Sequence, residues 1–391
     1  MIRILTFSTL FPNLKQPHHG VFVETRLRHL VESGKVDASV VAPVPWFPFR
    51  HPRFGTYSHY SAIPAEETRH GLRIRHPRYP VIPKIGMTIA PLLLAQAMKP
   101  VIGKILDEND IDLIDAHYFY PDGVAALKLG RYFNKPVVIT ARGTDINLIP
   151  QHNLPRKMIL WAAKNAAASI TVCEALKTEM VAMGASAEHI HPIRNGVDLD
   201  LFQPIDRDTQ RAAFGLDQFT LLSVGLLQPR KAHDLVIGAL PMLPDVRLYI
   251  AGDGPERNNL NALAASLGVT DRVTFLGSVS QSGLRQYYGA ADALVLASSR
   301  EGWANVLLES MACGTPVIAS NVWGTPEVVR EHAAGLLLKE RTAASIADAV
   351  TALRANPPAR TATRQYAEQF SWAETTDKQI ALFNRVLERR A

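Results

Sequence analysis

Short runs of β-branched and other apolar residues alternate with longer stretches of helical periodicity through most of the 391-residue chain. Several runs are apolar on both faces, which is typical of parallel strands covered by helices. We predict strands in the first half at residues 2–7, 38–42, 111–116, 137–140 and 170–172. We predict strands in the second half at residues 220–224, 247–251, 273–276, 293–296, 317–319 and 335–338. Helical patterns between them include residues 21–32, 235–240 and 305–313.

Two successive arrays of this kind predict an α/β chain with two doubly wound parallel sheets. A chain of 391 residues is also too long for one ordinary core. The domain boundary is expected at residues 193–204, where Asn195-Gly196 is a strong turn signal. Because ligands bind beyond the carboxyl ends of parallel strands, we expect the active site in the cleft between the two domains.

Residues 43–91 are rich in proline, histidine and arginine and interrupt the first array. We interpret them as a long irregular segment that is functional or mobile. Residues 85–106 mix apolar residues with Lys99 and Lys104, and we interpret them as a core-facing helix, with adsorption to a membrane surface as the alternative. A terminal helix is predicted from about Trp372 to the end.

The composition, with 47% hydrophobic and 20% charged residues, is that of a soluble globular protein. The first residues, MIRILTFSTLF, lack the basic region and cleavage site of a signal peptide. The longest apolar stretch, residues 89–97, is far shorter than the roughly 20 residues that a membrane span needs. Cys173 and Cys313 lie in apolar runs, which favours small core residues in a reducing compartment. The sequence therefore predicts a cytoplasmic protein.

Positive charge is concentrated in the first half of the chain. Residues 1–195 hold 23 Lys and Arg against 15 Asp and Glu, whereas residues 196–391 hold 19 against 21. A basic half can attract an anionic membrane surface, a phosphorylated acceptor or nucleic acid, or it can serve solubility alone.

The sharpest pattern is S-S-R-E-G-W-A-N-V-L-L-E-S-M-A-C-G-T-P-V, in which seven residues separate Glu301 from Glu309. Free backbone N–H groups at the start of the helix can hold a diphosphate, aided by the helix dipole. Glu301 would then bind sugar hydroxyls and Glu309 ribose hydroxyls. The alternative is an acid that favours the helix dipole and an ordinary surface glutamate. The other donor-binding candidates in this segment are Gly302, Trp303, Ala304, Asn305 and Val306.

This segment resembles the signature of the retaining glycosyltransferases of family 4, E-G followed by a second Glu and then A-x-G-x-P-V. The resemblance extends over nearly the whole chain, through V-G-L-L-Q-P-R-K-A-H-D, I-A-G-D-G-P-E, F-L-G-S-V, I-R-N-G-V-D and the ending F-S-W. It implies a GT-B fold, with two Rossmann-like domains facing across a cleft. Residues 1–194 would bind the acceptor, residues 195–371 would bind the nucleotide sugar, and a helix at about 372–391 would complete the first domain.

The resemblance also implies roles in the second half. Lys231 and Arg230 would stabilise the leaving diphosphate without a metal. The family normally carries an arginine where this chain has Leu226, and we expect Arg230 to supply that charge. Gly225 would let the backbone pass close to the phosphates. The remaining donor-binding candidates are Gly252 and Asp253, in a tight turn that can also be purely structural, and Val279, whose backbone would contact the nucleobase.

In the first half, His117 follows a predicted strand and matches a family histidine near the donor sugar and acceptor. A lone histidine is more often structural, but at the carboxyl end of a strand we favour a catalytic role in which His117 holds the sugar. The family's H-G-x-D loop is similar to R-G-T-D here, in which Asp145 would orient acceptor hydroxyls or cap a turn. Many relatives carry Gly-Gly after the first strand, where this chain has His19 in the first place. The resemblance assigns the acceptor to Gly20, Arg142, Gly143 and Asp145.

Other chemistries find no support in the sequence. No G-x-G-x-x-G opens a helix after a strand, and no Walker A sequence occurs. No Cys/His cluster is present, and His18 and His19 lack a third metal ligand. The resemblance therefore implies a metal-independent enzyme without a cofactor. It would move a sugar, with retention, from a nucleotide diphosphate sugar to a saccharide or lipid-linked saccharide in cell-surface or exopolysaccharide biosynthesis.

The expected partners are the nucleotide-sugar donor, the acceptor and an anionic membrane at its inner face, and not nucleic acid. E-G-W-A-N-V is similar to relatives that take UDP-sugars. One alternative is a nucleotide-sugar epimerase or hydrolase of the same fold. The other is a non-catalytic protein that binds nucleotide sugars or polysaccharide.

Overall fold

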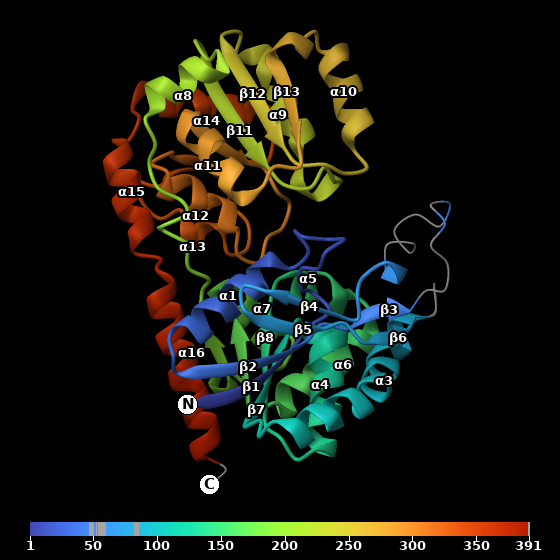
Figure 1. Cartoon of the computed structure of the whole chain (residues 1–391). Helices are drawn as coiled ribbons and strands as arrows, with labels where there is room; N and C mark the ends of the chain where they lie inside the picture. The colour runs from blue at the N-terminus through green and yellow to red at the C-terminus, as the bar shows by residue number, and fades with distance from the viewer. Residues whose placement is uncertain (47–50, 52, 54–59, 82–85, 390–391) are drawn as a thin grey trace. The chain divides into compact units, whose positions relative to one another are not determined.

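The computed structural model describes residues 1–46, 51, 53, 60–81 and 86–389. The described chain divides into two compact units, each built around its own sheet (Figure 1). Unit 1 comprises Met1–Asn195 and Ala373–Ala391, and unit 2 comprises Gly196–Trp372.

The main sheet of unit 1 has eight strands in the order β10-β9-β8-β7-β1-β2-β5-β4, and all neighbours are parallel except β4 and β5. The strands are β1 (Ile2–Phe7), β2 (Val36–Val41), β4 (Glu66–Arg69), β5 (Leu72–Arg75), β7 (Leu113–His117), β8 (Val137–Ala141), β9 (Ala168–Thr171) and β10 (Ile190–Pro192). A separate parallel pair is formed by β3 (Val44–Trp46) and β6 (Arg78–Pro80).

The helices of unit 1 lie between these strands and after unit 2. They are α1 (Val21–Glu32), α3 (Gly86–Glu108), α4 (Val124–Tyr132), α5 (Thr144–Asn147), α6 (Asn153–Asn165), α7 (Glu174–Ala182) and α16 (Trp372–Glu388). The last helix, red in Figure 1, buries Ile380, Leu382, Phe383 and Val386 in one core with residues of α1, β1 and β2. The C-terminal segment is therefore an integral part of the core of unit 1.

Unit 2 has a six-stranded, all-parallel sheet in the order β13-β12-β11-β14-β15-β16. Numbered within the unit, this is the strand order 3-2-1-4-5-6 of the Rossmann fold. The strands are β11 (Phe219–Val224), β12 (Val246–Ala251), β13 (Val273–Gly277), β14 (Ala293–Leu296), β15 (Val317–Ser320) and β16 (Gly335–Leu338). The predicted α/β class with doubly wound parallel sheets is confirmed.

The helices of unit 2 cover this sheet, and several begin at side-chain caps. Ser280 and Thr342 each accept a hydrogen bond from a backbone N–H three residues later, at the starts of α11 and α14. The helices are α8 (Arg207–Phe214), α9 (His233–Ala239), α10 (Arg257–Ser266), α11 (Gln281–Ala290), α12 (Asn305–Ala312), α13 (Thr325–Val328), α14 (Ala343–Ala355) and α15 (Arg360–Glu368).

The interpretation of residues 43–91 as irregular is wrong for the part that the structure describes. This part contains four strands and the start of α3, and β5 extends the main sheet in parallel to β2. The hairpin between β4 and β5 turns on His70 and Gly71, both at positive φ (49° and 77°), as a two-residue hairpin turn requires. Residues 47–50, 52, 54–59 and 82–85 of the segment lie outside the described residues.

One helix of the described chain, the stretch Thr88–Glu108 of α3, is long and apolar enough to cross a membrane. The core helix of a soluble protein passes the same test. Leu94, Met98 and Ile102 on this helix are completely buried, and its neighbours include α4 and β6. A core-facing side is therefore present, as the sequence predicts.

Candidate functional site

The candidate donor residues of unit 2 lie where strands end at the carboxyl edge of its sheet. Gly225 follows β11, Gly252 and Asp253 follow β12, Val279 follows β13, and the segment from Glu301 follows β14. Backbone bonds join the first three strand ends, because the Gly225 N–H donates to Ala251 O at 2.9 Å and the Gly252 N–H donates to Gly277 O at 2.8 Å. The structure thus brings these residues to one edge of one sheet.

Glycine is required at two of these strand ends. Gly225 and Gly252 have φ of 151° and 147°, a region that other residues rarely adopt. A Cβ on Gly252 would lie 1.9 Å from the carbonyl oxygen of Gly225. Asp253 is exposed and accepts the N–H of Gly254 at 2.8 Å, which is the contact of a turn.

Lys231, Arg230 and Glu301 form a compact charged cluster. The Lys231 Nζ lies 2.7 Å from Glu301 Oε1, and the Arg230 guanidinium lies 3.2 Å from the same oxygen. The two cations belong to a short helical turn, Pro229–Lys231. A backbone hydrogen bond connects this turn with the segment after β14, because the Ser299 N–H donates to Arg230 O at 2.9 Å. Leu226, at the position of the missing arginine, is 63% exposed.

The charges of this cluster decide the ionisation of Glu301. Burial alone would raise its pKa, but Lys231 and then Arg230 hold the pKa below its usual value. Glu301 is therefore a carboxylate at neutral pH, and two fixed cations stand beside it. A diphosphate that arrives here meets cations already held in position.

Glu309 is in a different environment, one turn into α12. It is 9% exposed, and its Oε2 accepts the hydroxyl of Tyr288 at 2.8 Å. Burial raises the pKa of Glu309 to about 7, against the opposing effect of the Tyr288 hydrogen bond. The carboxyl is thus close to half-protonated at neutral pH and can either donate to or accept from a ligand hydroxyl.

The segment between the two glutamates begins α12 at Asn305. Gly302, Trp303 and Ala304 precede the helix and are buried, whereas Asn305 and Val306 are partly exposed. The helix start therefore lies shortly after Glu301 in the sequence and at the same edge of the sheet. Its role as a diphosphate cradle stays a prediction.

In unit 1, His117 ends β7 and is held from both sides. Its Nδ1 accepts from Arg142 NH2 at 2.5 Å, and its Nε2 donates to Asp115 Oδ2 at 3.2 Å. Burial, more than any charge, lowers the pKa of His117 to about 4, so the ring is neutral. Both ring nitrogens are occupied, and the imidazole is 1% exposed. In this state His117 orients Arg142 and does not exchange protons near neutral pH.

Asp145 and Gly20 have structural contacts of their own. The Asp145 carboxylate accepts the N–H groups of Phe119, Arg142 and Gly143 at 2.8, 3.0 and 2.8 Å. These hydrogen bonds fix the loop after β8. They correspond to the alternative interpretation of Asp145, as a residue that caps a turn. Gly20 begins α1 at a φ of 72°, and a Cβ there would lie 2.4 Å from the backbone of Leu10.

Sequence reasoning missed a buried polar network around Arg26. This side chain of α1 is 1% exposed and donates from Nε to Gln379 Oε1 at 2.5 Å and from NH1 to Asn195 Oδ1 at 3.3 Å. Asn195 also accepts from Arg142 at 3.2 Å. An arginine on an amphipathic helix resembles a surface residue in the sequence, and here its partners come from α16 and from the distant residues Ile193 and Asn195. Among the described residues, no group of three His, Cys, Asp or Glu could hold a metal ion.

Comparison with protein families gives two matches. The family described as Glycosyltransferase Family 4 matches residues 19–201, and Glycosyl transferases group 1 matches residues 205–370. The D-inositol 3-phosphate glycosyltransferase of Mycolicibacterium smegmatis is 39% identical over 213 residues, 52% of this chain and 49% of that protein. The corresponding protein of Mycobacterium leprae is 41% identical over 217 residues, 52% of this chain and 50% of that protein. The chain thus matches about half the length of these curated relatives.

Solved structures share the fold at low sequence identity. The sucrose-phosphate synthase of Thermosynechococcus elongatus has a TM-score of 0.82 at 22% identity and covers 100% of both chains. Anabaena HepE in complex with UDP-glucose has a TM-score of 0.72 at 21% identity and covers 97% of this chain and 98% of that chain. The fold is therefore of the GT-B glycosyltransferase class. Together with the two family matches, one for each half, this places the chain in glycosyltransferase family 4.

Proposed function

We propose that the protein is a metal-independent, retaining glycosyltransferase that moves a sugar from a nucleotide diphosphate donor to a saccharide acceptor. The observation that carries this proposal is the Lys231–Arg230–Glu301 cluster at the carboxyl ends of β11 and β14. The two cations stabilise the diphosphate as its bond to the sugar breaks, and Glu301 binds sugar hydroxyls. The departing phosphate then deprotonates the acceptor hydroxyl on the same face of the sugar, so no side chain has to act as the base.

We propose a UDP-sugar as the donor. E-G-W-A-N-V resembles relatives that use such donors, and Anabaena HepE, which shares the fold, is described in complexes with UDP and UDP-glucose. In the proposed complex, Gly225 and Gly252 admit the phosphates, Glu309 binds the ribose and Val279 the base. Glu309 meets the ribose as a partly protonated group because burial raises its pKa to about 7.

For the acceptor, we propose a lipid-linked saccharide of cell-surface or exopolysaccharide biosynthesis, used at the cytoplasmic face of the membrane. The basic balance of residues 1–195 supports attraction to an anionic surface. On unit 1, Lys99 lies over the ring of Tyr132, which is 63% exposed, and Lys128 and Arg131 lie over Trp161. Cations together with exposed aromatic and apolar side chains suit a membrane interface.

A small phosphorylated acceptor is the second candidate. The curated relatives at 39–41% identity are named as D-inositol 3-phosphate glycosyltransferases. The same basic half suits a phosphorylated polyol as well as a lipid surface. The two candidates separate by vesicle binding, because only the first requires that the protein bind anionic vesicles at low salt.

The decisive experiment begins with thermal unfolding in UDP, GDP, ADP and dTDP, since a ligand that binds only the folded state raises its stability. The UDP-sugars are then incubated with each acceptor class, and NMR of the product gives the anomeric configuration. A product with inverted configuration contradicts retention. Donor turnover without any glycosylated acceptor supports an epimerase or hydrolase instead, and nucleotide binding without any turnover supports a non-catalytic binding protein.

A further inference from the structure

A cavity of about 340 Å³ lies at the amino-terminal edge of the unit 2 sheet. Phe219 is the first residue of β11, Asp292 directly precedes β14, and Pro316 directly precedes β15. In a parallel sheet these positions are at the opposite edge from Gly225 and Glu301, which follow the same strands. The cavity is therefore separate from the proposed donor site.

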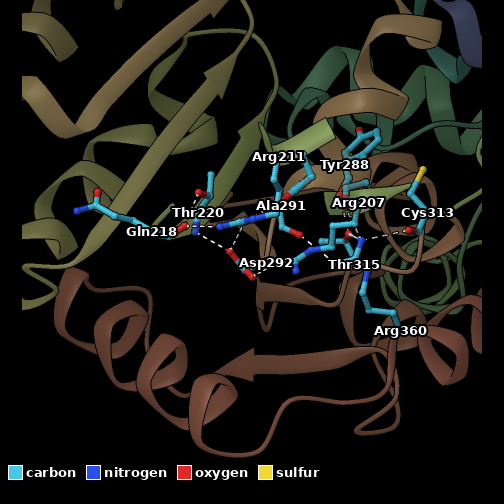
Figure 2. Close-up of polar contacts among 12 residues, drawn as sticks. Arg207, Arg211, Gln218, Thr220, Tyr288, Ala291, Asp292, Cys313, Thr315 and Arg360 are labelled. Carbon is cyan, nitrogen blue, oxygen red and sulfur yellow. Dashed lines mark hydrogen bonds and ion pairs between the residues drawn. The ribbon is translucent and has the colours of Figure 1, made fainter. Parts of the chain in front are cut away.

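Three guanidinium groups and one carboxylate line the cavity, from Arg207, Arg354, Arg360 and Asp292. The carboxylate is already satisfied, as Figure 2 shows. Asp292 accepts from Arg207, from Arg211 NH1 at 3.0 Å and from the N–H of Thr220 at 2.8 Å. It therefore has little capacity to neutralise Arg360, whereas Arg354 has an ion pair of its own with Asp245 at 2.6 Å.

Arg360 in particular is held by neutral acceptors. Its NH1 donates to Ala291 O at 3.1 Å, and its NH2 donates to Gly289 O at 2.8 Å and to Thr315 Oγ1 at 2.6 Å (Figure 2). None of the described carboxylates lies within ion-pair distance of this guanidinium. Burial, and after it the charge of Arg207, lowers the pKa of Arg360 to about 10. The charge is still present at neutral pH, in a setting that lacks a matching anion.

The rest of the wall is apolar and comes from Phe219, Pro316, Leu353, Pro357 and Pro358. The volume is at the lower end of the range of small-molecule sites, roughly 300–1,000 Å³. Guanidinium groups bind phosphate oxygens in a geometry that a single point charge cannot provide. We propose that this cavity, the arginine pocket, binds a small phosphate monoester whose ester group is flat and apolar.

Hydrogen bonds connect the arginine pocket with Glu309. Arg360 donates to Thr315 Oγ1, whose hydroxyl donates to Tyr288 O at 2.5 Å, and the Tyr288 hydroxyl donates to Glu309 at 2.8 Å. Arg360 also holds the end of α12 directly, because its NH2 donates to the carbonyl oxygen of the C-cap residue Cys313 at 3.3 Å. A phosphate that draws Arg360 toward the pocket therefore changes the support of the helix that carries Glu309. The arginine pocket is in this way an effector site for nucleotide binding, and this second step rests on the proposed function.

The test is isothermal titration with phenyl phosphate at low ionic strength, in the presence of saturating UDP so that the donor site is filled. Inorganic phosphate and phenol, titrated separately, measure the contributions of the anion and of the ring. Arg354→Gln and Arg207→Gln are the test variants, and Arg341→Gln, an exposed arginine elsewhere on unit 2, is the matched control. Arg354 is one-third exposed, pairs with Asp245 on the surface and lies over the ring of Phe219, so we expect its substitution to leave the fold intact.

We expect phenyl phosphate to bind more tightly than either fragment, and the Kd to rise at least about tenfold in both test variants but not in the control. Lys231→Ala leaves phenyl phosphate binding unchanged. Absence of binding to the wild type, equal Kd in all arginine variants, or loss of binding in Lys231→Ala overturns the proposal of a phosphate site in the arginine pocket.

For the effector step, we expect phenyl phosphate to change the Kd of UDP, and UDP to change the Kd of phenyl phosphate by the same factor. Independent binding overturns this step alone, and failure of UDP to bind at all contradicts the proposed function instead.

Discussion

Lys231 and Glu301 are 70 residues apart in the chain, yet the Lys231 Nζ lies 2.7 Å from Glu301 Oε1. The two side chains are 13% and 10% exposed, so each is largely removed from water. Neither Lys231 nor Glu301 would be stable as a charged group without the other, because burying an unpaired charge costs free energy. The pairing keeps a carboxylate and a cation ready at the same edge of the sheet before any ligand arrives.

Lys231→Ala should reduce the rate of sugar transfer at least about 100-fold, because removal of one preorganised donor to a developing anion typically has this effect. The Kd of the donor nucleotide should rise in the same variant. Steady-state kinetics with the best donor and titration of its nucleotide measure both effects. Lys339→Ala, an exposed lysine of unit 2, is the control and should behave as the wild type. Equal rates for the two variants would contradict the assigned role of Lys231.

The proposal that Arg230 supplies the positive charge missing at Leu226 can be tested by a rescue experiment. Arg230→Ala should reduce the transfer rate at least about tenfold, because one of two cations near the diphosphate is lost. Leu226 is 63% exposed, so an arginine is accommodated there. Adding Leu226→Arg to Arg230→Ala should restore much of the rate, whereas adding Leu226→Gln should not. Equal rates for the two double variants would show that Arg230 does not stand in for the family arginine.

Glu309 should make the stability of the protein depend on pH in a defined window. The folded pKa of about 7 lies above the ordinary 4.5, so this group's contribution to stability is full below pH 4.5 and is lost as pH rises through 7. The loss amounts to about 3 kcal/mol. Glu309→Gln removes the titration, so the free energy of unfolding of the wild type should fall relative to this variant between pH 4.5 and 7. Urea unfolding at each pH measures the difference.

Tyr288→Phe provides the matched perturbation. It removes a hydrogen bond that lowers the pKa of Glu309, so the pKa should rise and the pH window should extend upward. If the stability curves of the wild type and Glu309→Gln run parallel over this range, the carboxyl does not titrate there.

Arg26 and Arg28 lie two residues apart on α1 and should differ sharply in their contribution to stability. Arg26→Ala leaves Gln379 Oε1 and the carbonyl of Ile193 without this buried donor, while Asn195 keeps its bond from Arg142, and the change should cost about 3 kcal/mol. Arg28, with a 3.3 Å ion pair to Glu32, is 26% exposed, and Arg28→Ala should cost less than about 1 kcal/mol. Urea unfolding compares the two variants, and equal costs would contradict the role of Arg26 in the docking of α16.

The regular strands were predictable because they are strongly patterned. The predicted segments 2–7, 293–296 and 335–338 coincide with β1, β14 and β16, and the helix 21–32 coincides with α1. Buried parallel strands consist of short apolar runs between turn residues, a local signal that tertiary packing reinforces. The position of the candidate donor residues at the carboxyl edge of the sheet was predictable for the same reason, whereas their roles come from the family resemblance and stay predictions.

The segment of residues 43–91 was not predictable in the same way. Its strands β4 and β5 are four residues each and rich in charge, E-E-T-R and L-R-I-R, as an edge hairpin is, and this composition resembles a polar loop. His70-Gly71 was the available signal, because glycine at the second position of a two-residue turn favours a hairpin. The α15 helix after Pro357-Pro358 was missed because residues 360–368 bury only Thr363, Tyr366 and Ala367.

Only part of the surroundings of His117 could be predicted from the sequence. Its position at the end of β7 and its place on the same face as Asp115, two residues earlier, were predictable. The partner Arg142 is fixed by the register of β7 against β8 and by the loop that Asp145 holds. Spacing along the chain shows which residues reach an edge of a sheet. It does not show that a neighbouring guanidinium occupies the ring nitrogen that would otherwise face a ligand.

Gly252 and Gly268 both have positive φ, but only at Gly252 is there no room for a Cβ atom. Gly268→Ala, at a φ of 65° with nothing within 4 Å of the new Cβ, should cost about 1 kcal/mol from the backbone alone. In Gly252→Ala the new Cβ would lie 1.9 Å from Gly225 O, and that carbonyl belongs to the backbone that is expected to approach the phosphates. The cost should exceed that of Gly268→Ala by at least about 3 kcal/mol, with loss of nucleotide binding. Urea unfolding and UDP titration of the two variants measure this, and a Gly252→Ala protein that is stable and binds UDP normally would show that the two strand ends can separate.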